Sequence, residues 1–133
     1  MRRPALIEIV TDPFPGDEAM RRLWLVAWGD QGRGSFQPLL ERSLTHVGAY
    51  DGALLVGFVN VAWDGGVHAF ILDTRVDPDY RRQGIALRLV QRAAAVARQR
   101  GAEWLHVDFE PHLEGFYRQA GFGPTAAGLM RLT

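Results

Sequence analysis

The chain has 133 residues, of which 47% are hydrophobic and 23% are charged, and its formal net charge is zero. This size and composition are typical of one globular domain, which we place at residues 1–133, and they exclude a disordered, collagen-like or coiled-coil protein. The zero net charge offers no overall attraction for nucleic acid or an anionic membrane, and no stretch reaches the roughly 20 apolar residues of a membrane span. Because the chain has no cysteine, disulfides, thiolate metal sites and a cysteine nucleophile are excluded. We therefore expect a cytoplasmic protein that binds neither nucleic acid nor membrane and holds no metal.

The first part of the chain predicts one strand and two helices. Residues 6–10 alternate apolar and polar side chains, as a half-buried strand does. Apolar residues at three- and four-residue spacing then predict a helix from Glu18 to Trp28. A glycine-rich loop, GDQGRGS, follows, and Ser35 is a typical cap for a short second helix that ends near Leu44.

The middle of the chain predicts an antiparallel meander. The turn sequences Asp51-Gly52 and Asp64-Gly65-Gly66 favour tight hairpins, since Asp-Gly supplies the positive φ angles that such turns need. They separate three predicted strands at residues 46–50, 53–63 and 67–76.

The last third changes to an alternation of helices and strands. Apolar residues from Ile85 to Val96 mark one face of a helix that Gly101 ends, and residues 104–109 predict a further strand. Strand-helix-strand order implies a parallel pair with a right-handed crossover. Pro111 suits the start of a last helix, and we expect a final hairpin between Phe122 and Leu132. The predicted fold is therefore α/β, an antiparallel meander that leads into one parallel crossover.

The segment between Arg81 and Ala86 favours phosphate binding. It joins a strand to a helix start, where unpaired N–H groups and the helix dipole attract anions, and Gly84 allows close approach to the backbone. Residues 75–100 contain seven arginines and two acids, although the whole chain is neutral. Residues 103–114, by contrast, contain four acids and no arginine, which suggests a cationic ligand beside them. The alternative is that the glycine only makes a turn and that the arginines are solvated.

The segment VDPDYRRQGIALRLV resembles the acetyl-CoA pyrophosphate-binding segment of the GNAT superfamily of N-acyltransferases, whose core pattern is [QR]-x-x-G-x-[GA]. Arg81 to Ala86 matches every fixed position, and FYRQAGF at residues 116–122 resembles the superfamily's second hallmark. The resemblance implies the GNAT fold: an α/β (α+β) domain with a mixed, mostly antiparallel sheet, a parallel crossover between the fourth and fifth strands, and helices on both faces. It also implies direct transfer of an acetyl group from the co-substrate acetyl-CoA to an amine, in a ternary complex.

The resemblance also assigns expected roles to residues of this chain. The backbone amides of Gln83, Gly84, Ile85 and Ala86 would hold the pyrophosphate, and Arg81, Arg82 or Arg88 would add positive charge. Val76 would offer backbone groups to the pantetheine arm and the acetyl carbonyl. Tyr117 would donate a proton to the departing CoA thiolate, since a phenol with a pKa of about 10 is a reasonable acid for that step. The alternative for Tyr117 is packing in the core beside Phe116 and Phe122.

The general base is less defined by the sequence. Asp108 is the first candidate for a base or an amine anchor, because it shares a predicted strand face with His106 and Glu110. Glu110 stands where many family members have an asparagine, and it alternatively caps the following helix. Trp28 beside the glycine-rich loop could stack on an acceptor, whereas Trp24 is expected in the core. His46 and His68 have no partners at metal-ligand spacing.

These features predict an N-acetyltransferase (EC 2.3.1.-) that acts on a primary amine of a small molecule or peptide. An alternative is a non-catalytic GNAT-fold module that binds CoA or a partner protein, and a third is a nucleic-acid module that uses the arginine-rich helix. A homodimer agrees with the habit of the family, although nothing in the residues indicates it. The acceptor itself is not specified by the fold.

Overall fold

The computed structural model describes residues 6–30, 32 and 34–133, and over these residues it forms one five-stranded sheet in the order β1-β2-β3-β4-β5. Neighbouring strands from β1 to β4 are antiparallel, and β4 and β5 are parallel. The predicted mixed sheet with one parallel crossover is therefore confirmed. The strands are β1 (Ile7–Thr11), β2 (Thr45–Asp51), β3 (Leu54–Trp63), β4 (His68–Val76) and β5 (Trp104–His106).

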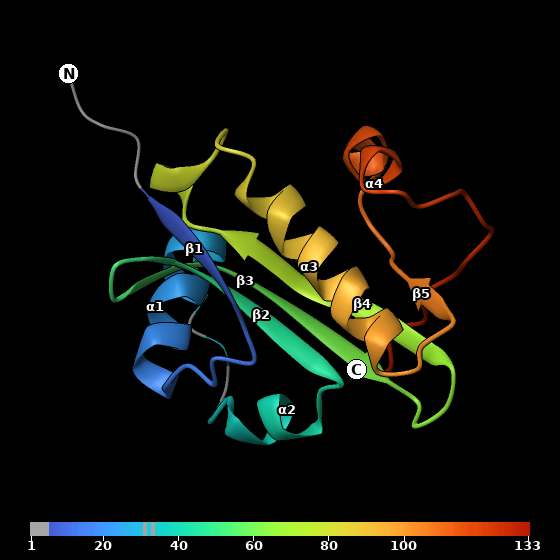
Figure 1. Ribbon diagram of the computed structural model, residues 1–133, viewed down its shortest axis with the longest axis horizontal. Helices are drawn as coiled ribbons and strands as arrows, with labels where there is room; N and C mark the ends of the chain where they lie inside the picture. Colours follow the sequence, from blue (N-terminus) through green and yellow to red (C-terminus); the bar gives the residue numbers. More distant parts are fainter. Residues whose placement is uncertain (1–5, 31, 33) are drawn as a thin grey trace.

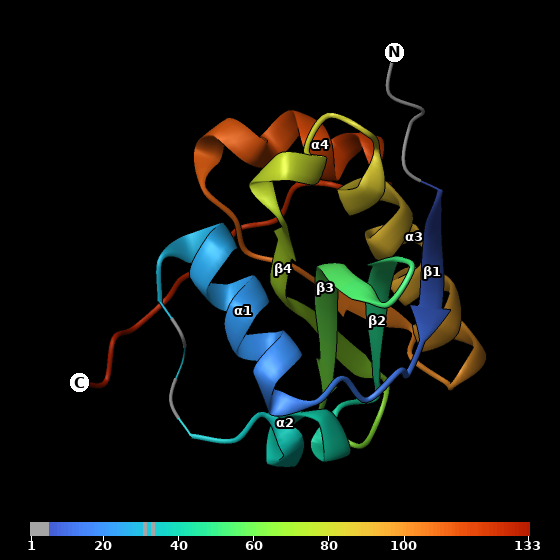
Figure 2. The same cartoon turned by 90° about the vertical axis from the view of Figure 1, so that its left-hand side faces the viewer.

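Helices cover both faces of the sheet, as predicted (Figures 1 and 2). The long helix α3 (Ile85–Gln99) crosses one face, and α1 (Asp17–Trp28) and α2 (Gln37–Arg42) lie on the other. Two 3₁₀ turns, η1 (Pro78–Tyr80) and η2 (Pro111–Leu113), precede α3 and the short helix α4 (Glu114–Gln119). None of the helices in the described ranges is both long and apolar enough to cross a membrane.

The C-terminal end differs from its prediction. The expected hairpin between Phe122 and Leu132 is wrong: residues 123–133 form no helix or strand, and all of their side chains are exposed. A strand exists only while a neighbour pairs with it, and this segment, which Gly123, Pro124 and Gly128 interrupt, runs away from the sheet on the α1 side (Figure 2). The fifth strand is also shorter than the predicted range of 104–109, since β5 ends at His106. In the glycine-rich loop, Gln31 and Arg33 lie outside the described residues, as do residues 1–5.

Two apolar clusters hold the layers together. The first packs the inner face of α3, with Leu89 and Ala93, against valines of β2 and β3 such as Val47 and Val59. The second packs α1 and the start of α2 against the other face of β3 and includes Phe58. Burial of such side chains stabilises the fold by about 1.5–3 kcal/mol each. Both faces of the central strands are therefore buried, which agrees with the continuous apolar run of β3.

The pairing of β3 with β4 contains one irregularity, which decides where the side chains of β4 point. Asp73 and Thr74 lie together opposite the single residue Val59, so β4 carries one extra residue there. Asp73 has a φ of 58°, a left-handed conformation that aspartate tolerates better than most residues. An extra residue reverses the alternation of faces, so Arg75 lies on the α1 face although Ile71 lies on the α3 face.

His46 is a core residue, in agreement with the absence of metal-ligand spacing. Its side chain is 1% exposed, and Nε2 accepts a hydrogen bond from the Phe14 backbone N–H at 2.9 Å. The ring also stacks on Phe58 at a centroid distance of 6.1 Å. Burial lowers the pKa of His46 below its ordinary value of 6.5, although the carboxylate of Asp12 opposes this effect. The folded chain therefore holds a neutral imidazole at this position.

We predict that the free energy of unfolding decreases as the pH falls below about 6.5, because the unfolded His46 takes up a proton that the folded one resists. The loss begins at the unfolded pKa and is complete below the lowered folded pKa. Urea unfolding followed by tryptophan fluorescence between about pH 7.5 and 5 measures it. His46→Gln should flatten this dependence, whereas His112→Gln, at an exposed position, should not. Equal pH dependence in wild type and His46→Gln would contradict the assignment.

Candidate functional site

A cavity of about 500 Å³ opens where β4 ends, between the start of α3, the C-terminal end of α1 and helix α4. Its walls therefore combine segments that are far apart in the sequence. The described residues that line it are Ala27, Trp28, Thr74, Arg75, Val76, Tyr80, Arg81, Arg82, Gly84, Ile85, Ala86, Leu87, Leu113, Phe116, Tyr117 and Gln119.

The turn between η1 and α3 offers backbone donors to this cavity. Arg82 and Gly84 have positive φ angles of 63° and 74°, and such alternation turns successive N–H groups toward one side. Helix α3 begins at Ile85, and its first backbone bond runs from the Arg88 N–H to the Gly84 carbonyl at 3.1 Å. The N–H groups of residues 85–87 precede that bond and so have no partner within the helix. Since a Cβ on Gly84 would meet open space, an anion can approach these donors and the positive end of the helix dipole.

Most of the predicted cofactor-binding residues line this cavity, and two do not. Gln83 is exposed and is not part of the lining. Arg88 points elsewhere, since its Nη2 donates a hydrogen bond to the Ile7 carbonyl at 3.2 Å. The predicted residues that do line the cavity are Val76, Arg81, Arg82, Gly84, Ile85 and Ala86.

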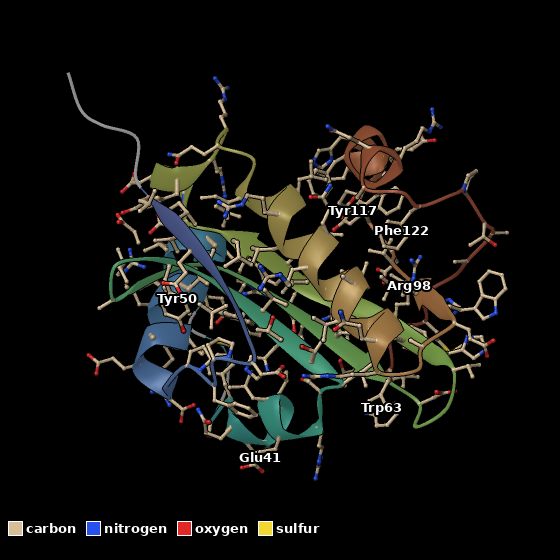
Figure 3. The ribbon with its side chains drawn as sticks, in the orientation of Figure 1. Glu41, Tyr50, Trp63, Arg98, Tyr117 and Phe122 are labelled. Atoms are coloured by element: carbon tan, nitrogen blue, oxygen red, sulfur yellow. The ribbon has the colours of Figure 1, made fainter. Side chains whose placement is uncertain are left out.

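Tyr117 is buried against an aromatic group and also lines the cavity. Its ring is 6% exposed and lies 4.8 Å from that of Phe109 and 4.9 Å from that of Phe116, measured between centroids. Figure 3 shows its side chain directed from α4 toward the sheet, beside Phe122. Burial raises the pKa of Tyr117 above its ordinary value of 10.0, and the Asp108 carboxylate adds to this effect. The phenol therefore stays protonated at neutral pH, and packing and proton donation are compatible roles.

The acidic residues of the fifth-strand region lie outside the cavity. Asp108 follows the end of β5, is exposed, and does not line the cavity. Glu110 precedes η2 without a side-chain cap, so its predicted capping role is not observed. His106 Nε2 lies 2.9 Å from His68 Nδ1, in an exposed contact between β5 and β4. Within the described ranges, no group of three or more histidine, aspartate or glutamate side chains could hold a metal ion.

Two cavity residues on β4, Thr74 and Arg75, were not singled out by the sequence analysis. The Thr74 hydroxyl and Nη1 of Arg75 are buried, and neither has a hydrogen-bond partner among the described residues. Sequence alternation could not place them, because the extra residue in β4 interrupts it. The one available signal was the position of Arg75 near the end of a strand whose central residues, Ala69 to Leu72, are apolar.

The guanidinium of Arg75 lies between two tryptophan rings of α1. Its Cζ is 3.1 Å from the ring centroid of Trp24 and 3.5 Å from that of Trp28. Nε donates to the Asp73 carbonyl at 3.1 Å, and Nη2 donates to Asp73 Oδ1 at 3.3 Å. Burial lowers the pKa of Arg75 to about 10, and Asp73 opposes this effect. Arg75 therefore remains a cation at neutral pH inside the fold.

A second ion pair joins α1 to the segment that precedes the turn. Arg22 Nη2 lies 2.6 Å from Oδ2 of Asp77, whose side chain is 3% exposed. The other oxygen of Asp77 accepts a hydrogen bond from the Asp79 N–H at 3.0 Å. This carboxylate thus fixes the start of η1 relative to α1.

The chain and its fold resemble known acetyltransferases. An acetyltransferase of the GNAT family from Streptococcus pneumoniae has 25% identity and a TM-score of 0.76, over 96% of this chain and 98% of its own. Glucosamine-6-phosphate N-acetyltransferase from Arabidopsis thaliana has 14% identity and a TM-score of 0.74, over 94% of this chain and 97% of its own. An aminoglycoside N-acetyltransferase in complex with CoA has 16% identity and a TM-score of 0.75, over 100% and 98%. No curated protein sequence matches the chain significantly.

The model of the acetyltransferase (GNAT) family matches residues 3–122. This range contains all five strands, the turn before α3 and Tyr117. Sequence and fold thus lead to the same assignment, and the chain belongs to the GNAT acetyltransferase family.

Proposed function

We propose that the protein transfers an acetyl group from acetyl-CoA to a primary amine of a small molecule or peptide, by direct attack within a ternary complex. The observation that carries this proposal is the shared cavity. The unpaired donors at the start of α3 and the buried phenol of Tyr117 line the same space of about 500 Å³. The CoA complex of the aminoglycoside acetyltransferase supports the choice of donor, since that protein has the same fold.

In this proposal, the turn before α3 would hold the pyrophosphate of acetyl-CoA. The free N–H groups of residues 85–87 and the space beside Gly84 suit a compact anion. Arg81 and Arg82 line the same part and would add charge-assisted hydrogen bonds. Val76, at the end of β4, would offer backbone groups to the pantetheine arm.

The cavity would then bring the acceptor amine to the thioester carbonyl. The amine nitrogen forms a bond with the carbonyl carbon, and the carbonyl oxygen takes up negative charge. The Val76 N–H is our candidate donor to that oxygen, a contact of the kind that commonly dominates acyl transfer. The chain has no cysteine for an acyl-enzyme thioester, which agrees with direct attack.

Tyr117 would complete the reaction as a general acid. When the carbon–sulfur bond breaks, its electron pair stays on sulfur, and Tyr117 donates its proton to this thiolate. The attacking amine loses one proton to water, and the phenolate recovers one from water, so the protons balance. Water accepts the proton of the amine because the described cavity lining contains no carboxylate and no imidazole that could act as the base. Asp108, our sequence-based candidate for the base, remains an alternative from outside the cavity.

A panel of amines incubated with acetyl-CoA tests the function, with release of free CoA thiol as the readout. Turnover of at least one amine supports the acetyltransferase. Stabilisation of the fold by CoA without turnover of any amine would support the non-catalytic CoA-binding module instead. Stabilisation by duplex DNA that CoA does not compete away would favour the nucleic-acid module.

We predict that Gly84→Glu abolishes the rise in melting temperature that CoA produces, because a carboxylate would occupy the proposed phosphate site. Gly84→Ala is the matched control, since both variants strain a residue with a φ of 74° and only glutamate adds charge. Differential scanning fluorimetry with and without CoA measures the effect. A normal CoA-induced shift in Gly84→Glu would show that the nucleotide binds elsewhere.

Tyr117→Phe should lower kcat by roughly 10²- to 10⁴-fold, the usual contribution of a general acid, with little change in CoA affinity. Tyr80→Phe is the matched control, because Tyr80 also lines the cavity but donates its hydroxyl to Asp51. Steady-state kinetics and CoA-induced melting shifts separate the two effects. Unchanged kcat with a lower melting temperature would identify Tyr117 as a packing residue only.

The rate should rise with pH until the amine itself is deprotonated, because no carboxylate or imidazole lines the described cavity. It should not decline below about pH 10, since burial raises the pKa of Tyr117 above its ordinary value. Initial rates measured at each pH give kcat/KM, and its dependence on pH is the profile. A rate that levels off near the pKa of a carboxylate or histidine would reveal a base that this mechanism lacks.

A further inference from the structure

A buried cation lies where β4 and α1 meet at the cavity. Arg75 is 3% exposed, and its guanidinium is held between the rings of Trp24 and Trp28. The two rings differ in their surroundings: Trp24 is buried, whereas Trp28 is 59% exposed and lines the cavity with Arg75. The Arg75 side chain itself is 0% exposed, so an oxygen of a ligand reaches the guanidinium only when the exposed Trp28 ring moves aside.

The hydrogen bonds of this guanidinium leave one nitrogen without a partner. Nε and Nη2 both donate to Asp73, whereas Nη1 is buried and has no acceptor among the described residues. Buried donors in folded proteins are nearly always paired, and an unpaired one costs free energy, more so when it is charged. An oxygen of a bound molecule would remove that cost.

The charges of the cavity favour an anionic oxygen. Its described lining contains three arginines and no aspartate or glutamate. The nearby carboxylates are already paired, Asp73 with Arg75 and Asp77 with Arg22. Arg81 and Arg82 belong to the turn before α3 and are assigned to the acyl donor above. Arg75 lies beside the end of α1 rather than in the turn, and although Asp73 pairs with its Nη2, its Nη1 still offers a donor on a positively charged group.

We propose that the acceptor amine carries a carboxylate or a phosphate and that Arg75 binds this group through Nη1, as a specificity-determining residue. The inference rests on the proposed function, because it describes the acceptor of that reaction. It adds an anionic group to the cationic ligand that the sequence suggested, a suggestion that came from acidic residues outside the cavity. The acceptor is then an amino acid or an aminophosphate rather than a simple polyamine.

Binding of matched amines to the CoA-loaded protein tests this inference without any need for turnover. The first set is L-phenylalanine, L-phenylalaninamide and phenethylamine, and the second is phosphoethanolamine and ethanolamine. Titration calorimetry gives each dissociation constant. In the wild type, the anionic member of at least one set should bind about 10- to 100-fold more tightly than its neutral counterparts, as expected for one charge-assisted hydrogen bond. The set that shows the preference distinguishes carboxylate from phosphate.

Arg75→Met should bring this ratio close to one, and Arg75→Lys should retain part of it because the charge remains. Arg21→Met is the control for loss of an arginine near this site, since Arg21 lies on α1, has a side chain that is 43% exposed, and pairs with Asp17. If Arg75 is only structural, Arg75→Met weakens the binding of all amines equally and leaves the ratio of their dissociation constants unchanged. That result overturns the inference. Equal affinity for anionic and neutral amines in the wild type overturns it as well, even if Arg75→Met does not fold. Anion-selective binding that depends on Arg75, without acetylation, would support the inference and contradict the proposed function.

Discussion

The extra residue in β4 is the constraint on which the candidate site depends. A regular strand would place Arg75 on the α3 face with Ile71, inside an apolar cluster that offers a cation no partner. The bulge at Asp73 and Thr74 instead turns Arg75 toward α1. The left-handed Asp73 costs about 1–3 kcal/mol, which two hydrogen bonds from Arg75 and contact with two tryptophan rings offset. One irregularity thereby ties α1 to β4 and shapes the cavity between them.

The cavity concentrates positive charge in a chain whose formal net charge is zero. Backbone N–H groups at the start of α3, the arginines of the preceding turn and Arg75 all border one space, and the described lining has no acid. Asp77 does not line the cavity, but it helps to fix the cavity's shape because its ion pair with Arg22 holds η1 against α1. Anions are thus favoured in two parts of the cavity, and the buried phenol of Tyr117 lines the same space. This arrangement is the physical basis on which we propose one donor and one acceptor that both carry negative groups.

Local patterns in the sequence were sufficient for most of the fold. The meander, the crossover and helix α3 follow from alternation, turn residues and apolar spacing, and the turn before α3 follows from Arg81 to Ala86. The prediction of a hairpin after Phe122 was wrong because a strand needs a neighbouring strand to pair with, and local sequence patterns do not show whether one is present. Thr74 and Arg75 were not predicted as cavity residues for a different reason. Period-two alternation holds only in a regular ladder, and the extra residue at Asp73 interrupts it. Asp108 could not be placed by alternation either, because β5 ends at His106 and alternation applies only within a strand.

The most direct test of the account is a calorimetric titration of acetyl-CoA into the wild-type protein at low and high salt. We expect one site per chain with micromolar affinity that weakens as salt increases, because arginines and backbone donors would bind the phosphates. Dephospho-CoA, which keeps the pyrophosphate, should still bind. Absence of binding at both salt concentrations would contradict the assignment of the turn before α3 as a pyrophosphate site.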